Sequence, residues 1–164
     1  MLLRELGFQC ITTAEQDSPD GRFPTVKSPN PENAESLKVA IKLAEETDGD
    51  IVIGTDPDCD RMGVAVRDNS ENMLILTGNQ IGSLLLYYRL KTLFEKQILK
   101  PSNCSNAVVI KTFVTTELQT AIAMKFGVNV VNTLTGVKDI GQKLAKYEQS
   151  LPADILGNYR SLGV

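Results

Sequence analysis

Short apolar segments of extended character alternate with longer segments of helical periodicity along most of the chain. Extended segments are predicted at residues 8–13, 50–54, 62–66, 73–78, 107–114 and 128–134. Helices are predicted at 2–7, 33–46, 79–97, 115–127 and 140–149. This alternation is typical of proteins in which helices pack on the faces of a sheet. The sequence therefore predicts the α/β class.

Two segments without periodicity interrupt this pattern. Residues 15–33 are rich in Pro, Asp, Gly and Asn and are predicted to form a long irregular loop, a kind of loop that often carries function. Residues 100–106, KPSNCSN, have the composition of a linker, so we place a domain boundary there. The chain starts directly in a helix, and we expect a further segment upstream of it.

Three aspartates, Asp56, Asp58 and Asp60, stand at alternate positions between the apolar strands predicted at 50–54 and 62–66. Carboxylates that converge in this way repel one another unless a cation binds or protons are taken up. Mg²⁺ prefers oxygen ligands and completes its coordination with water or phosphate oxygens. Arg61 adds a planar guanidinium suited to phosphate. The stretch predicts a magnesium site for phosphoryl chemistry.

Other interpretations of this stretch fit less well. An EF-hand that started at Asp56 would need Gly at position 61 and Glu at 67, where the chain has Arg61 and Arg67. A plain solvated turn remains possible for a single Asp-x-Asp, but three aspartates and an arginine between two apolar strands favour a binding site. Cys59 lies inside the loop, and because Mg²⁺ prefers oxygen we expect its thiol not to be a ligand.

Composition excludes several classes of function. The net charge of −3 and the lack of a basic block argue against nucleic-acid and membrane partners. The three cysteines are scattered, which favours a reducing, cytoplasmic location over a disulfide framework. The chain has no histidine, so imidazole cannot serve as base, nucleophile or metal ligand.

Four stretches together resemble the α-D-phosphohexomutases, the phosphoglucomutase and phosphomannomutase superfamily. They are FPTVKSPNPEN at 23–33, GTDPDCDRMGVAV at 54–66, LTGNQIGSLLLYY at 76–88 and TLTGVKDIG at 133–141. They occur in the family's order and cover most of the chain. The resemblance implies three-layer α/β/α domains with mixed, mostly parallel sheets. Residues 1–100 would be most of domain II, lacking its first strand, and 105–164 part of domain III.

The resemblance also implies roles for single residues. Asp56, Asp58 and Asp60 would hold Mg²⁺, and Arg61 would contact phosphate. Thr135, Gly136 and Lys138 would belong to the loop that contacts the sugar, although Lys138 could equally be a surface lysine at a helix start. The intact enzyme would interconvert the 1- and 6-phosphates of glucose or mannose through an enzyme phosphoserine.

The family's phosphoserine lies in a T-x-S-H-N-P loop, which a chain without histidine does not contain. Ser28, in KSPNPE, matches a different segment of the family and is not its substitute. We therefore expect a fragment that is inactive alone, whose partners are a hexose phosphate and domains I and IV of the same protein. We also expect an open sheet edge and self-association of the isolated chain. The tail at 153–164 matches no segment of the family.

Two other functions stay open at this point. The first is a Mg²⁺-dependent phosphohydrolase with Asp56 or Asp58 as nucleophile, although no convincing second acidic pair follows downstream. The second is a non-catalytic module that binds metal and sugar phosphate. Lys111, at the end of a predicted strand, could contact phosphate, but we expect it to be a solvated residue at the sheet edge.

Overall fold

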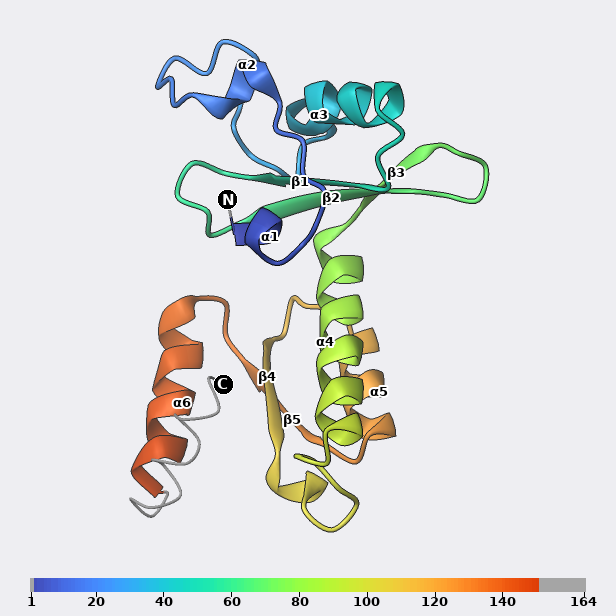
Figure 1. Cartoon of the computed structure of the whole chain (residues 1–164). Coiled ribbons are helices and arrows are strands. Elements are labelled where there is room, and N and C mark those ends of the chain that lie inside the picture. Colours follow the sequence, from blue (N-terminus) through green and yellow to red (C-terminus); the bar gives the residue numbers. More distant parts are fainter. Residues whose placement is uncertain (1, 151–164) are drawn as a thin grey trace. The chain divides into compact units, whose positions relative to one another are not determined.

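The computed structural model describes residues 2–150 and divides after Ile81 into two compact units (Figure 1). The tail at 153–164 and the last part of the expected second domain lie outside the described residues. None of the described helices combines the length and the apolar character that crossing a bilayer requires.

The first unit contains one antiparallel sheet with the strand order β1-β2-β3. Its strands are β1 (Ile51–Thr55), β2 (Met62–Arg67) and β3 (Met73–Leu76). Its helices are α1 (Leu2–Glu5), α2 (Ala14–Asp17) and α3 (Ala34–Glu46). The strand predicted at 8–13 is wrong: no described segment pairs with these residues, and the side chains of Phe8 and Ile11 are exposed.

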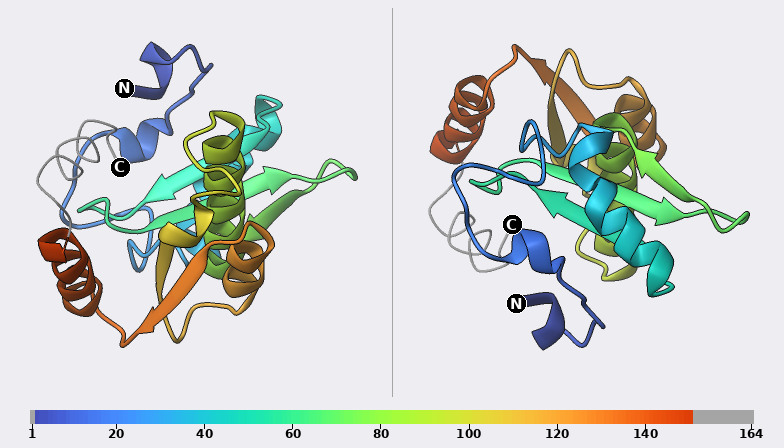
Figure 2. Two further views of the ribbon diagram at one scale, coloured as in Figure 1. Left: turned by 90° about the horizontal axis from the view of Figure 1, so that it is seen from below. Right: turned by 90° about the horizontal axis from the view of Figure 1, so that it is seen from above.

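Helix α3 covers one face of this sheet, as the views in Figure 2 show. Leu37 and Ala44 of α3 pack against Val52 of β1 and Ala65 of β2, and all four are buried. On the opposite face Ile51, in the same strand as Val52, is exposed, because successive side chains of a strand point to opposite sides. Strand β1 is therefore buried on one face only.

The second unit contains a two-stranded parallel sheet between helices. Strands β4 (Val108–Thr112) and β5 (Asn129–Thr133) are joined through α5 (Leu118–Lys125), which confirms the predicted β-α-β unit. Helix α4 (Gly78–Glu95) and α5 lie on one side of the strands, and α6 (Val137–Ser150) lies on the other (Figure 1). A short 3₁₀ helix, η1 (Cys104–Asn106), precedes β4.

The α/β class is confirmed, with one antiparallel and one parallel sheet among the described strands. Parallel pairing does not dominate, because a short connection returns β1 directly into β2 as a hairpin. The division between the units also lies earlier than the expected boundary at 100–106. Cys104 packs against the buried cluster of Leu90, Ala123 and Val128, so the segment 100–106 lies inside the second unit.

Candidate metal and phosphate site

The three aspartates lie at the tip of the hairpin formed by β1 and β2. The backbone oxygen of Asp56 accepts a hydrogen bond from the Cys59 amide (3.1 Å), and the Asp56 amide donates to the Arg61 carbonyl (3.4 Å). Pro57 occupies the second position of this turn, which its fixed φ favours. Cys59 follows with φ of +60°, in the left-handed region. The residues from 56 to 61 thus form a short, closed connection.

This connection brings the carboxylates of Asp56, Asp58 and Asp60 together. One oxygen from each lies within 4.8 Å of the others. The Asp56 side chain is only 1% exposed, whereas Asp58 and Asp60 are exposed to solvent. The group therefore has one fixed, buried member and two members with free access to water.

Arg61 holds the buried carboxylate in place. Its Nε donates to Asp56 Oδ2 at 2.7 Å, and its backbone amide donates to Asp56 Oδ1 at 3.2 Å. Nε also lies 3.6 Å from Asp60 Oδ1. Among the described residues, the two terminal nitrogens of the guanidinium have no hydrogen-bond partner, and the side chain is half-exposed. These nitrogens are free to contact an anion.

The aspartates differ in their proton affinity. Burial by itself raises the pKa of Asp56, but hydrogen bonds from the backbone and side chain of Arg61 outweigh it and lower the pKa to about 2. A hydrogen bond with Asp56 and the negative charge of Asp58 raise the pKa of Asp60. The hydrogen bond to Asp56 also raises the pKa of Arg61. At neutral pH the fold thus favours an ionised Asp56 and penalises negative charge on Asp60.

The oxygen atoms present fit a hard divalent cation. Mg–O bonds of about 2.1 Å place octahedral ligands about 3 Å apart when adjacent and about 4 Å apart when opposite. The separations within 4.8 Å are close to these values, and the exposed side chains of Asp58 and Asp60 can rotate inward. Each oxygen of Asp56 accepts one hydrogen bond and keeps a second lone pair for a metal.

The other predicted site residues belong to the second unit. Thr135, Gly136 and Lys138 are exposed and lie between the end of β5 and the first turn of α6. Gly136 has φ of +135°, which side chains rarely adopt, and its carbonyl accepts the Asp139 amide at 3.2 Å. Lys138 lies within α6, so the geometry of the loop does not separate its two proposed roles.

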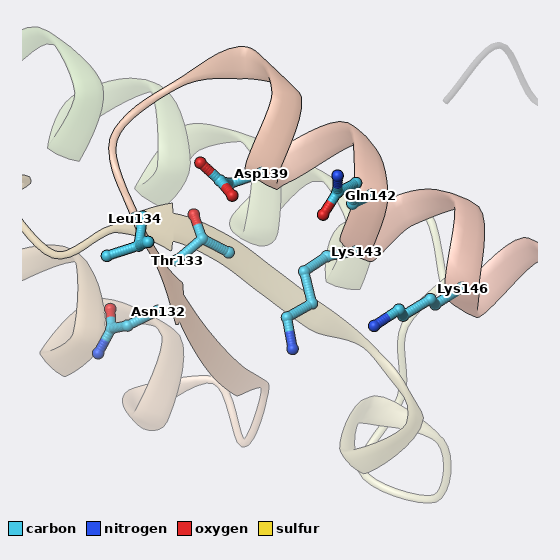
Figure 3. A pocket seen from close by; sticks show the side chains of 7 residues that line it. All are labelled: Asn132, Thr133, Leu134, Asp139, Gln142, Lys143 and Lys146. Carbon is cyan, nitrogen blue, oxygen red and sulfur yellow. The ribbon is translucent and has the colours of Figure 1, made fainter.

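A pocket of about 250 Å³ lies beside this loop, between the end of β5 and α6 (Figure 3). It is lined by Asn132, Thr133, Leu134, Asp139, Gln142, Lys143 and Lys146. The three predicted loop residues are not among those that line it. Neither Lys143 nor Lys146 forms an ion pair with a described residue, so both side chains add positive charge to the pocket.

Lys111 shows where reasoning from the sequence went wrong. It is 4% exposed rather than solvated, and its Nζ donates to the Thr115 carbonyl (2.9 Å) and to Glu117 Oε1 (3.0 Å). Hydrogen bonds from Thr120 and Lys111 lower the pKa of Glu117. The acidic residue six positions downstream was the available signal, because the tight turn after β4 returns it to the lysine.

Two family models match the chain in succession. Residues 1–69 match "Phosphoglucomutase/phosphomannomutase, alpha/beta/alpha domain II", and residues 77–154 match domain III of the same family. The chain belongs to the phosphoglucomutase/phosphomannomutase family. The order of the two matches is the order expected from the four motifs. The aspartate loop lies within the first match and the 133–138 loop within the second.

Relatives of known name agree with this assignment. A phosphoglucomutase of Staphylococcus aureus (strain MRSA252) is 35% identical over 148 residues, which are 90% of this chain and 25% of the relative. One of Staphylococcus epidermidis (strain ATCC 12228) is 37% identical over 144 residues, 87% of this chain and 25% of the relative. The chain thus spans about a quarter of the length of these relatives.

A solved apo-form N-acetylglucosamine-phosphate mutase of the alpha-D-phosphohexomutase superfamily matches at 21% identity and a TM-score of 0.43, over 57% of this chain and 20% of that one.

Proposed function

We propose that the chain supplies the magnesium loop and the sugar-contacting loop of a phosphohexomutase, an isomerase that moves phosphate between the 1- and 6-positions of glucose or mannose. The observation that supports this most strongly is the group of Asp56, Asp58 and Asp60, whose oxygens lie within 4.8 Å of one another beside an arginine with free nitrogens. Family membership gives the arrangement its reaction class.

In this proposal the three aspartates hold Mg²⁺, which neutralises charge on the phosphoryl group during transfer. Asp56 is the fixed ligand, because the two hydrogen bonds from Arg61 keep its buried carboxylate ionised and in place. Asp58 and Asp60 are the mobile ligands that turn toward the cation. The terminal nitrogens of Arg61 bind a phosphate oxygen, and Nε keeps its bond to Asp56.

The phosphoryl donor of the proposed reaction is a phosphoserine on the enzyme, outside these 164 residues. The residues of this chain then bind and orient the phosphates. Thr135 and Gly136 contact the sugar, because they lie exposed in the loop after β5. Lys138, the second residue of α6, adds a positive charge beside this loop.

The phosphohydrolase alternative receives less support from the geometry. In-line attack on phosphorus needs more space around the attacking oxygen than a bond to a small cation does, and the Asp56 side chain is 1% exposed with both oxygens held by Arg61. Asp58 is accessible, but no described residue donates a hydrogen bond to its carboxylate to orient it for attack.

Calorimetric titration with Mg²⁺ tests the proposal, with and without glucose 1,6-bisphosphate, on this chain and on Asp58→Asn. We expect Mg²⁺ binding that the substitution weakens and the bisphosphate strengthens, because phosphate oxygens complete the metal's coordination. Lys91→Gln, which removes an exposed charge in α4, serves as a control for non-specific effects of charge. Equal binding by the parent chain and by Asp58→Asn would contradict the proposal.

A further inference from the structure

Two glycines face each other at the base of the aspartate loop. Gly54 of β1 pairs directly with Gly63 of β2, one step below the last pair of the ladder, Thr55 and Met62. The pair Val52–Ala65 lies two steps along the ladder from this pair, on the face of the sheet that packs on α3, and side chains alternate along a strand. A side chain at position 54 would therefore share the face from which Asp56 projects.

The space above both glycines is filled by the segment that precedes α3 and by α3 itself. A Cβ on Gly63 would overlap the backbone carbonyl of Pro31, and a Cβ on Gly54 would lie 2.5 Å from Leu37 Cδ2. Pro31 and Leu37 are the largest fully buried side chains among the described residues. The chain around Pro31 is thus in direct contact with the strand that leaves the aspartate loop.

This segment is held firmly in its conformation. Pro29 and Pro31 restrict φ at two of three successive residues. The Asn30 side chain accepts the Glu32 amide at 3.0 Å. The Ser36 hydroxyl lies within donor distance of two carbonyls, Asn30 O at 2.8 Å and Asn33 O at 2.7 Å. The segment is therefore tied to the first turn of α3 and cannot move away easily.

We infer that Pro29–Glu32 is a rigid floor for the aspartate loop and that Gly63 is a positioning residue, because only glycine lets β2 rest on this floor. The inference rests on the proposed magnesium role of the loop. Position 63 lies two residues after Arg61, so a shift of β2 at this point displaces the Arg61 donors from the Asp56 carboxylate. Asp56 then no longer projects in the direction that binds a cation.

The two glycines provide a matched pair of variants. Gly63→Ala places a methyl group against backbone, which cannot rotate aside, whereas Gly54→Ala meets the end of a leucine side chain, which can change rotamer. Both changes add one methyl group at the same level of the hairpin. A general loss of stability would affect both variants, whereas a loss of positioning would affect only Gly63→Ala.

The experiment measures Mg²⁺ affinity by calorimetry and, without metal, the NMR signal of the Arg61 Nε–H group. We expect Gly63→Ala to weaken Mg²⁺ binding by about 10–100-fold, as other losses of support around a metal do. We also expect its Arg61 Nε–H to exchange faster with water, because the bond to Asp56 lengthens. Gly54→Ala should keep the parent values in both measurements and lose only thermal stability.

Parent-like values for Gly63→Ala, or equal losses in both variants, would overturn the inference. If Gly63→Ala does not fold, Ser36→Ala takes its place, because it removes the tie of the floor to α3; it should weaken Mg²⁺ binding and speed the Nε–H exchange, and parent-like values would overturn the inference. If the parent chain itself binds no Mg²⁺, the proposed function fails, and the Arg61 signal still decides the question of positioning.

Discussion

Among residues 2–150, each unit buries one charged side chain, and the two are paired in the same way. Asp56 in the first unit is 2% exposed and pairs with the half-exposed Arg61. Lys111 in the second unit is 4% exposed and pairs with Glu117, whose side chain is 71% exposed. In both, a buried charge is compensated by a partner that stays in contact with water, which lowers the cost of burial.

The difference lies in the charge that remains after pairing. Lys111 Nζ is bound by one carbonyl and one carboxylate, so the pair is neutral. The connection from Asp56 to Arg61 carries three carboxylates and one guanidinium, which leaves −2 (1 − 3). A buried ion pair alone therefore does not mark a binding site. The surplus negative charge beside a fixed carboxylate is the feature on which the proposed cation site rests.

The largest expected effects come from truncating one core leucine in each unit. Leu37 and Leu90 are both almost fully buried, so Leu37→Ala and Leu90→Ala should each lower the free energy of unfolding of their unit by about 2–5 kcal/mol. Only Leu37 lies under the hairpin, so only Leu37→Ala should also weaken Mg²⁺ binding. Denaturant titrations followed through the amide signals of β2 and β4 measure the stability of the two units, and calorimetry measures Mg²⁺ affinity. Equal effects on Mg²⁺ would remove the distinction between the units.

The next effect concerns the neutral pair. Glu117→Gln leaves the Lys111 ammonium buried without a counter-charge, whereas Lys111→Met replaces it with an apolar side chain of similar length. We expect Glu117→Gln to lower the thermal midpoint of the second unit by several degrees and Lys111→Met to lower it less. Neither should change Mg²⁺ affinity. A larger loss in Lys111→Met would mean that the charge itself stabilises the unit.

The stability of the first unit should depend on pH in the acid range through Asp56 and Asp60. The pKa of Asp56 falls from 3.8 to about 2 in the fold, so its contribution to stability is complete above pH 3.8 and is lost as the pH falls through 2. The pKa of Asp60 is raised, so its protonation acts in the opposite direction and first relieves repulsion. Between pH 4 and 2 the first unit should therefore lose more stability in the parent than in Asp56→Asn. Denaturant midpoints at each pH measure this.

The smallest effect is expected at Cys59. Its left-handed conformation costs a non-glycine residue about 1–2 kcal/mol, and Cys59→Gly removes this cost but adds freedom to the unfolded chain. The net gain in stability should be below about 1 kcal/mol. Mg²⁺ affinity should not change, because the thiol is not a ligand in the proposed site. A clear loss of affinity in this variant would assign the thiol a role.

Much of the fold follows from local patterns. The helices at 34–46 and 137–150 and all five described strands lie where periodicity predicts them. The direction in which strands pair cannot be predicted from local patterns, because the apolar run at 51–55 is compatible with a buried parallel strand or with one strand of a hairpin. The strand predicted at 8–13 fails for a related reason, since a strand needs a partner that its own residues do not encode.

The candidate site could be predicted from the sequence only in part. The spacing of Asp56, Asp58 and Asp60 predicted that their oxygens meet, and the loop brings them within 4.8 Å. The contact of Pro31 with Gly63 depends on the segment before α3, which is distant in sequence from the loop. No local pattern contains that information.

Carbon-13 NMR of the side-chain carboxylates during Mg²⁺ titration tests the central claim most directly. We predict that the signals of Asp56, Asp58 and Asp60 shift together with one dissociation constant, while the signal of Glu117 stays unchanged. Asp58→Asn should weaken the shifts of the other two aspartates. If the three aspartates do not respond, or if Mg²⁺ shifts exposed carboxylates throughout the chain without preference, the surplus charge of the loop does not form a cation site.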